Sequence, residues 1–331
     1  MLQRILGRTG LAVSPLGLGL AALGRPGYIN LDHARDMAGG TEVEVMRARA
    51  WAVLDAAWAR GIRYFDAARS YGRAEEFLGA WLAARGIAPD TVSIGSKWGY
   101  IYTAGWRVEA EVHEVKDHSL EVLQRQRAES DTLLGPQLDL YQIHSASLES
   151  GVLDDPTVLA ELARYRDSGL AIGLSLSGPQ QAEVLRRAIG IEVGGAPLFG
   201  SAQVTWNLLE PSAGEALREA HEAGVGIIVK EALANGRLTD RNDDPAFAPR
   251  LALLREIAAE QQTTVDALAI AAALTQPWTS VVLSGAANVE QLASNLRALD
   301  VFWTDAIAER LSSLAEPPEA YWQTRSALDW N

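Results

Sequence analysis

The sequence predicts a single domain built as an α/β barrel, the (β/α)8 or TIM fold, in which eight parallel strands alternate with helices. About eight short apolar runs alternate with helix-like stretches along the 331 residues, and eight is the number of strands at which a parallel sheet closes on itself. The alternation continues without a long repeat, a low-complexity tract or an interdomain linker. One barrel therefore accounts for residues 1–331 as well as two smaller domains would.

The individual elements follow from apolar periodicity and from turn residues. Leu2–Leu6 and Leu11–Val13 flank the turn GRTG and predict a β-hairpin that could plug the closed end of the barrel. The predicted barrel strands are Leu16–Leu20, Ile62–Ala67, Val92–Lys97, Leu138–His144, Ala171–Leu176, Ser201–Trp206, Val225–Lys230 and Ser280–Gly285. The predicted helices are Arg47–Arg60, Ala74–Arg85, Val108–Leu134, Pro156–Ser168, Pro179–Ile189, Gly214–Ala223, Pro249–Gln261, Thr264–Leu274, Val289–Leu299 and Asp305–Leu314.

Two segments outside this alternation are expected to cover the barrel mouth. Ala21–Val45 is rich in glycine and turn residues, and it exceeds the roughly 12 to 15 residues beyond which loops are uncommon unless functional or disordered. Pro317–Asn331 carries turn residues and two tryptophans. We predict that this tail is a lid segment.

Composition limits the classes of function. The net charge is −13 and the isoelectric point about 4.9, so a nucleic acid would meet a repulsive field. There is no cysteine, which excludes disulfides and cysteine-based metal sites. The histidines of HEVKDH are five residues apart and do not share a helical face, so we predict no metal site. The sequence lacks a signal-peptide pattern and an apolar run long enough to span a membrane, which indicates a cytoplasmic protein.

Four chemically distinct side chains fall at or just after predicted strand ends. Asp66 lies at the end of IRYFDA, and Tyr71 lies in the loop that follows. Lys97 ends VSIGSK and His144 ends LDLYQIH. Each residue taken alone has a common structural role, such as a cap or a solvated charge. Because the carboxyl ends of barrel strands meet at one mouth, however, we expect the four to converge.

This group of residue types is suited to proton transfer. A free phenol has a pKa near 10, so Tyr71 needs a neighbouring positive charge to stabilise its anion. Lys97 could supply that charge, with Asp66 holding the lysine in an ion pair and His144 orienting the reacting oxygen. Such a device would protonate a carbonyl oxygen while hydride reaches the carbon. Since no side chain donates hydride, a nicotinamide cofactor is implied.

Three motifs carry a resemblance to a known family. FDAARSYG (Phe65–Gly72), GSKWG (Gly95–Gly99) and DLYQIH (Asp139–His144) resemble the signature regions of the aldo-keto reductases, NAD(P)-dependent barrel enzymes. The resemblance implies that Tyr71 is the general acid or base and that His144 positions the carbonyl. It also implies a pairing of Asp66 with Lys97.

The same resemblance implies a set of cofactor-binding residues. Ser175 and Gln203 correspond to residues that hold the nicotinamide carboxamide, although Leu176 replaces a usual asparagine, and Lys230 stands where many members stack a tyrosine on the ring. The segment 283–296 resembles the adenosine-phosphate region, with contacts expected from Gln291, Ser294 and Asn295. This stretch has no basic residue before Arg297, so a 2′-phosphate has no obvious cation there and NAD is as open as NADP. The expected cofactor is therefore NADP or NAD.

Aromatic residues on loops suggest a pocket for a small carbonyl or sugar substrate. The candidates are Tyr28, Trp98, Tyr100, Tyr102, Trp106 and Trp322, although loop aromatics serve oligomer interfaces equally well. The first hypothesis is therefore an oxidoreductase that interconverts an aldehyde or ketone, or a sugar hemiacetal, with its alcohol or lactone. The alternatives are a cofactor-binding regulatory subunit of the same fold with slow or no turnover, and a barrel isomerase or lyase. The sequence fixes no number of subunits.

Overall fold

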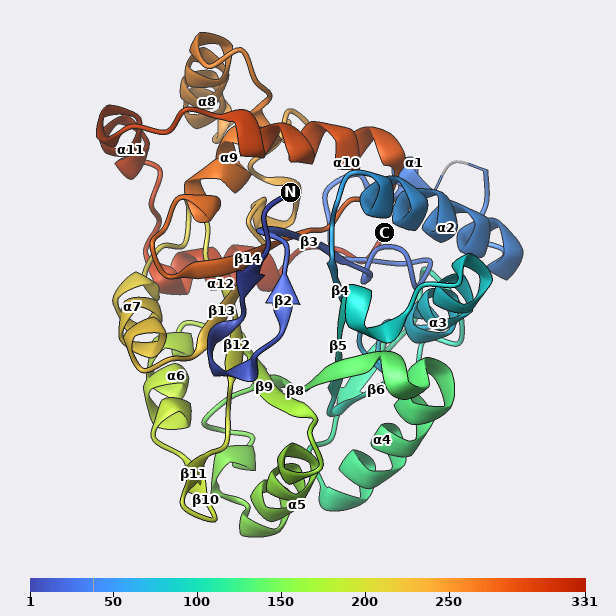
Figure 1. Ribbon diagram of the computed structural model, residues 1–331. Helices are drawn as coiled ribbons and strands as arrows, with labels where there is room; N and C mark the ends of the chain where they lie inside the picture. The colour runs from blue at the N-terminus through green and yellow to red at the C-terminus, as the bar shows by residue number, and fades with distance from the viewer. Residues whose placement is uncertain (38) are drawn as a thin grey trace.

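The barrel closes in the computed structural model, which describes residues 1–37 and 39–331 (Figure 1). Its parallel strands follow the order β12-β13-β14-β3-β4-β5-β8-β9. Their bounds are β3 Leu16–Gly19, β4 Tyr64–Asp66, β5 Ser93–Trp98, β8 Leu138–Ala146, β9 Ala171–Leu176, β12 Ser201–Thr205, β13 Gly226–Lys230 and β14 Thr279–Ser284. The predicted fold class is confirmed, and each barrel strand lies within about two residues of its predicted limits.

Helices surround this sheet as an outer ring, which Figure 1 shows around the strands. They are α2 Val43–Ala59, α3 Ala74–Arg85, α4 Leu120–Leu134, α5 Pro156–Asp167, α6 Gln181–Ile189, α7 Gly214–Glu222, α8 Ala248–Glu260, α9 Val265–Leu274, α10 Val289–Leu296 and α11 Asp305–Ser312. Side chains that accept hydrogen bonds from free backbone N–H groups begin five of them: Ser119, Asp155, Thr264, Asn288 and Thr304. These residues are favoured N-caps, which is why the helix starts are local properties of the sequence.

The floor of the barrel is closed by the predicted hairpin. Strands β1 (Arg4–Ile5) and β2 (Ala12–Val13) pair antiparallel and cross the barrel end that faces the viewer in Figure 1. The floor cluster consists of Leu6, Val13, Tyr64, Leu140, Ile228 and Val281, all fully buried. A Cβ on Gly7 would lie 2.0 Å from the backbone nitrogen of Gly226. The hairpin and β13 therefore meet through glycine backbones, which no larger residue would permit.

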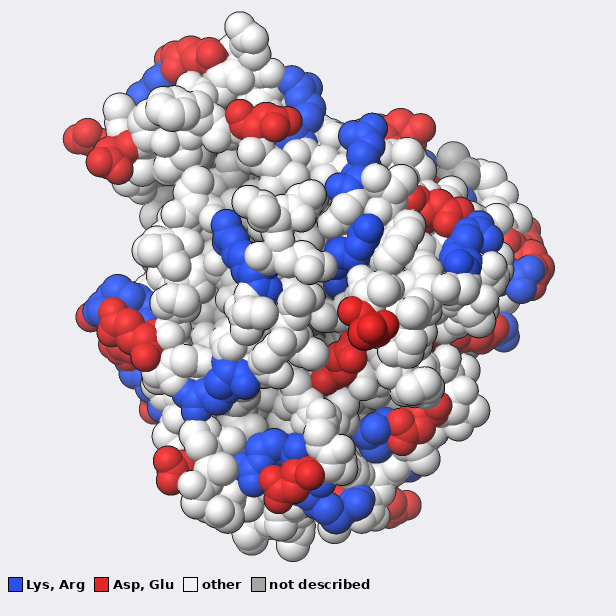
Figure 2. All heavy atoms as spheres, viewed as in Figure 1, with Lys and Arg blue, Asp and Glu red and all other residues white. Residues whose placement is uncertain are grey.

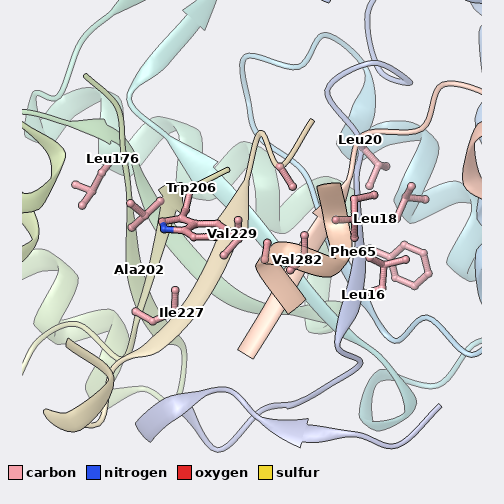
Figure 3. Close-up of a cluster of buried hydrophobic side chains, with 14 of the residues drawn as sticks. Leu16, Leu18, Leu20, Phe65, Leu176, Ala202, Trp206, Ile227, Val229 and Val282 are labelled. Atoms are coloured by element: carbon pink, nitrogen blue, oxygen red, sulfur yellow. The ribbon is translucent and has the colours of Figure 1, made fainter. Parts of the chain in front are cut away.

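A second and larger core lies between the strands and the helices. Figure 3 shows Leu16, Leu18 and Phe65 gathered on one side of this core, Ala202 and Val229 on the other, and Val282 between the two groups. Successive residues of a strand point to opposite faces, so these side chains leave the alternate positions free to point into the barrel. Polar side chains at these alternate positions near the strand ends therefore face the mouth of the barrel.

One predicted helix begins at the wrong residue. Val108–Leu134 was expected to be helical, but its first part contains β7 (Glu114–Lys116), which pairs with β6 (Tyr100–Tyr102). The helix α4 starts only at Leu120, after the cap Ser119. Pairing with the preceding strand β6 in a hairpin has overridden the local helical pattern. A second small hairpin, β10 (Glu192–Val193) with β11 (Ala196–Pro197), was not predicted.

The long loop and the tail come together over the mouth. Ala21–Val45, of which Ala38 lies outside the described residues, contains the short helix α1 (His33–Asp36). The tail forms α12 (Pro318–Ser326) and then runs to Asn331. The backbones of Tyr28 and Asn331 exchange two hydrogen bonds of 3.1 and 3.2 Å. Tyr321 and Trp322 are buried in the core, so the tail is part lid and part core.

The surface on the floor side mixes charges of both signs, as Figure 2 shows for the face seen in Figure 1. The excess of acidic over basic residues is therefore not segregated on this face. Within the described ranges, none of the helices is long and apolar enough to cross a bilayer.

Candidate active site

A cavity of about 710 Å³ opens at the carboxyl ends of the barrel strands. Its lining includes Asp66, Tyr71 and His144, at or just after the barrel strand ends, which we call the reactive end, and Gln291 and Asn295 of the outer helix α10, which we call the far end. Ligand cavities in proteins typically enclose about 300 to 1,000 Å³. The cavity therefore joins the predicted proton-transfer group to the predicted cofactor region in one continuous space.

A buried ion pair lies beneath the reactive end of this cavity. The Lys97 ammonium contacts Oδ2 of Asp66 and donates a second hydrogen bond of 2.9 Å to the carbonyl of Ala67. The other carboxylate oxygen, Oδ1, accepts hydrogen bonds from Tyr64 Oη at 3.2 Å, Gln142 Nε2 at 3.1 Å and Gln203 Nε2 at 2.9 Å. Burial lowers the pKa of Lys97, and the charge of Asp66 opposes that shift. Asp66 is thus fixed on both oxygens, and it fixes the lysine in turn.

Tyr71 stands over this pair with a second cation beside it. The Lys97 nitrogen lies 4.9 Å from the centroid of the Tyr71 ring, and Cζ of Arg25 lies 5.2 Å from the same centroid. Burial, followed by the charge of Asp66, raises the pKa of Tyr71 well above its usual value, and Arg25 opposes this rise. The phenol is therefore held in its protonated form. The sequence had suggested the opposite shift, because it could not show that burial would outweigh the neighbouring positive charge.

The turn that presents Tyr71 depends on two glycines. Gly72 has φ +58°, and a Cβ at this position would lie 2.4 Å from the carbonyl oxygen of Gly24. That same oxygen accepts a 2.7 Å hydrogen bond from the backbone N–H of Arg73. The positive φ and the close approach both require glycine. The start of the long loop thereby braces the tyrosine.

His144 closes the group on the third side. Its ring packs edge to face against Tyr71 and Tyr100, with centroids 5.5 and 4.9 Å apart. Burial, and next the charge of Lys97, lowers the pKa of His144 well below its usual value, so the imidazole is neutral. Ser70 Oγ lies 3.4 Å from Nδ1. When Ser70 donates to that nitrogen, the proton of the neutral ring resides on Nε2.

A second set of charges borders the same end of the cavity. Lys230 Nζ donates to Thr205 Oγ1 at 2.6 Å and lies 3.8 Å from Glu231, which also pairs with Arg325 at 2.6 Å. Burial lowers the pKa of Lys230 to about 8 against the pull of Glu231. Although burial raises the pKa of Glu231, Arg325 and Lys230 lower it more, to about 2. This acid therefore remains ionised.

Sequence reasoning missed several of these lining residues. Glu231 follows Lys230 directly at a strand end, and that position could have indicated it. Arg25 carries no such signal; it donates to Glu114 at 2.9 Å, and its Cζ lies 4.6 Å from the ring of Trp330. These contacts join three distant segments, so local patterns could not reveal them.

The predicted cofactor residues divide into three groups. Gln203 and Lys230 line the reactive end, and Gln291, Ser294 and Asn295 line the far end. Ser175 is buried, accepts a 2.8 Å hydrogen bond from the backbone of Ser145, and lies outside the cavity lining. Polar groups both at the barrel strand ends and on α10, lining one cavity, fit a dinucleotide. Among residues 1–37 and 39–331, no cluster of three acidic or histidine side chains is arranged to hold a metal ion.

Only two aromatic residues predicted for the substrate pocket, Tyr28 and Tyr100, line the cavity. The expectation fails for Trp98, which is fully buried and packs against His118. Lys97 points into the barrel, so its neighbour must point outward.

Three further aromatic residues also lie outside the lining. Trp106 packs on Phe77 and donates to the Thr41 carbonyl at 2.7 Å. Trp322 is buried against Tyr321. Tyr102 lies on the β6–β7 hairpin and is likewise absent from the lining. Trp330, which was not chosen, lines the cavity instead.

Comparisons with known proteins agree with this architecture. The solved structure of an aldo-keto reductase from Bacillus halodurans, in its holo form, superimposes with a TM-score of 0.71 and 23% identity, over 96% of this chain and 97% of that one. At this identity the likeness concerns the fold.

Curated relatives extend the comparison to sequence. A pyridoxal 4-dehydrogenase from Microbacterium luteolum is 28% identical over 94% of this chain and 98% of its own length. A D-threo-aldose 1-dehydrogenase from a Pseudomonas species is 26% identical over 69% of this chain and 68% of its own length. The model of the Aldo/keto reductase family matches residues 15–316. The chain therefore belongs to the aldo/keto reductase family of oxidoreductases.

Proposed function

We propose that this protein is a nicotinamide-dependent oxidoreductase that interconverts a small polar aldehyde, ketone or hemiacetal with its alcohol or lactone. The observation that carries the proposal is the convergence of Tyr71, His144 and Asp66 in the lining of one cavity, with Lys97 paired to Asp66 beneath it. A cavity of about 710 Å³ has room for a cofactor and a substrate carbonyl together.

Tyr71 is proposed as the proton donor in the reducing direction. Its raised pKa keeps the hydroxyl protonated at neutral pH, which is the form that a general acid needs. As the proton leaves, the nearby ammonium of Lys97 and guanidinium of Arg25 stabilise the developing phenolate. When bound, a nicotinamide cofactor supplies or accepts the hydride, which no side chain can do.

His144 is proposed to orient the reacting oxygen. When Nδ1 accepts a hydrogen bond from Ser70, the neutral ring carries its N–H at Nε2 and can donate it to a carbonyl oxygen. Because the neutral imidazole has no extra proton to give up, the transferred proton comes from Tyr71. The Asp66 carboxylate, held by three further donors, keeps Lys97 charged despite its burial.

The charges around the substrate end favour a hydroxylated or otherwise polar substrate. Arg25, Glu114, Glu231 and Arg325 line this end together with Tyr28, Tyr100 and Trp330. Such a wall offers hydrogen bonds to hydroxyl groups and flat faces to a ring. One relative is named for pyridoxal and another for a D-threo-aldose, and we propose a substrate of one of these two kinds.

Turnover separates the enzyme from the regulatory subunit. We expect steady, cofactor-coupled absorbance change at 340 nm with a panel of aldehydes and aldoses. Tyr71→Phe should lower kcat roughly 10²- to 10⁴-fold while dinucleotide affinity stays unchanged. Tyr165→Phe, on the distant helix α5, is the matched control and should retain activity.

Each other outcome has a defined meaning. Unchanged turnover in Tyr71→Phe would remove this residue as the proton donor. Binding of dinucleotide without turnover on any carbonyl would favour the regulatory subunit, and the absence of binding would favour an isomerase or lyase.

A further inference from the structure

Three acidic side chains line the far end of the cavity, the part beside α10, which we call the far arm. Asp240, Asp266 and Glu290 line it together with Thr264, Gln291, Ser294 and Asn295. Asp266 accepts a 3.0 Å hydrogen bond from Ser294 Oγ, and Glu290 is exposed. Along the described part of this arm, Arg241 is the one lysine or arginine in the lining; the other three of the cavity, Arg25, Lys230 and Arg325, lie at the reactive end.

Arg241 is already engaged by a carboxylate behind the cavity wall. Asp36 of α1 accepts from Nη1 through Oδ2 at 2.7 Å and from Nη2 through Oδ1 at 2.6 Å. The Asp36 side chain is only 3% exposed. Although the Arg241 side chain is 30% exposed, two hydrogen bonds to one carboxylate balance the charge of its guanidinium and fix its direction.

The same carboxylate also holds Gln291. Its Nε2 donates to Asp36 Oδ1 at 2.7 Å, and Asn288 Nδ2 lies 3.3 Å from the same oxygen. Asp36 therefore links the long loop to α10 and to the segment after β13. The Gln291 amide, which faces the arm, is fixed beside a carboxylate.

We infer that this arm selects NAD(H) over NADP(H), and that Asp36 sets the preference by neutralising Arg241. The inference rests on the proposed nicotinamide-dependent function. The proton-transfer group lies at the barrel strand ends, whereas this arm lies beside the outer helix α10. The nicotinamide therefore belongs at the strand ends and the adenosine ribose in this arm.

The two cofactors differ in this arm by one group. NAD carries a 2′-hydroxyl, which donates a hydrogen bond to a carboxylate. NADP carries a phosphate with a charge of roughly −1.5 to −2 at neutral pH. That charge would meet the lining carboxylates of Asp266 and Glu290 and an arginine whose positive charge Asp36 balances. The third lining carboxylate, Asp240, is paired with Arg255. Repulsion between like charges weakens binding of the 2′-phosphate, whereas a carboxylate can accept a hydrogen bond from the 2′-hydroxyl.

Binding titrations test the inference without reference to catalysis. Fluorescence titration of the wild-type protein with NADH and NADPH, at fixed salt and without substrate, should give a Kd for NADPH at least about tenfold higher. Asp36→Asn should tighten NADPH about tenfold, because Arg241 then keeps its charge for the phosphate. The Kd for NADH should stay within about twofold.

The control is an exposed ion pair away from the cavity. Glu222→Gln on α7 removes a carboxylate that pairs with the exposed Arg218 outside the cavity lining, and it should change neither Kd. Circular dichroism melting reports whether Asp36→Asn remains folded. Should it unfold, Asp266→Asn removes a lining charge instead and is expected to shift the ratio in the same direction.

Three results would overturn the inference. Wild-type protein that binds NADPH as tightly as NADH would contradict the preference and leave the proposed function intact. If Asp36→Asn lowered the Kd for NADH and NADPH equally, Arg241 would be binding a phosphate that both cofactors carry and not the 2′-phosphate. Failure to bind either dinucleotide would remove the proposed function and the preference together.

Discussion

The two ends of the barrel are built from the same strands but from opposite kinds of side chain. At the floor, Leu6 and Val13 of the hairpin region pack on Leu140 and Ile228, and all four are fully buried. At the mouth, Asp66 and Lys97 are equally buried. The floor is a core that stabilises the fold, whereas the mouth keeps charges away from water.

The contrast shows where stability and chemistry are separated. Apolar burial contributes roughly 25 cal/mol per Å², while a buried ion pair seldom adds net stability and is strongly destabilising when one partner is removed. Tyr64 joins the two ends, because its ring belongs to the floor cluster and its hydroxyl donates to Asp66. The floor thus positions the carboxylate on which the mouth depends.

Breaking the Lys97–Asp66 ion pair at the mouth, the mouth pair, should have the largest effect on stability and turnover. Asp66→Asn leaves Lys97 buried without its counter-charge, so we expect the free energy of unfolding to fall by about 3 to 5 kcal/mol. Turnover should also fall by orders of magnitude. Urea denaturation and steady-state kinetics measure the two effects.

An exposed ion pair supplies the comparison. Asp154→Asn breaks the surface contact with Arg187 and should cost less than about 1 kcal/mol. Equal losses in the two variants would show that burial does not distinguish the mouth pair.

Opening the floor should reduce stability without touching the chemistry. Leu6→Ala removes a fully buried side chain from the floor cluster, and we expect a loss of about 2 to 5 kcal/mol. Folded protein should keep its KM and kcat, because the mouth residues are unchanged. Leu2→Ala, at a residue 90% exposed, should stay within about 0.5 kcal/mol of wild type. A large kcat loss in folded Leu6→Ala protein would contradict the separation of the two ends.

The smallest effect concerns one acid at the floor. Asp139 accepts a 2.8 Å hydrogen bond from the backbone of Ile94, and burial raises its pKa from 3.8 to about 6. The folded state therefore binds the proton more tightly than the unfolded state does, and this contribution to stability is lost as pH rises from about 4 to 6.

The variant Asp139→Asn should not lose this stability as pH rises, because its side chain does not titrate. The difference in urea midpoint between the variant and wild type is expected to grow in favour of the variant as pH rises from 4 to 7. A difference that stays constant with pH would show that Asp139 titrates alike in both states.

Much of this architecture can be predicted from the amino-acid sequence. Each barrel strand is a short apolar run between turn signals, and caps such as Ser119 and Thr264 mark where helices begin. Asp66, Lys97 and His144 could be selected because they lie at strand ends, where a closed parallel barrel gathers its side chains. These features depend on neighbours in sequence, so local patterns suffice to predict them.

The remaining features depend on pairing between segments that a local apolar pattern does not show. The β6–β7 hairpin replaces the start of a predicted helix because Tyr100 pairs with Lys116. Arg25 and Trp330 reach the cavity only when the long loop and the tail meet. The sequence by itself determined the barrel and the residues at its strand ends. The tertiary structure decided which loops cover the mouth, that burial keeps Tyr71 protonated, and that Asp36 neutralises Arg241, because desolvation and long-range pairing arise only once the chain has folded.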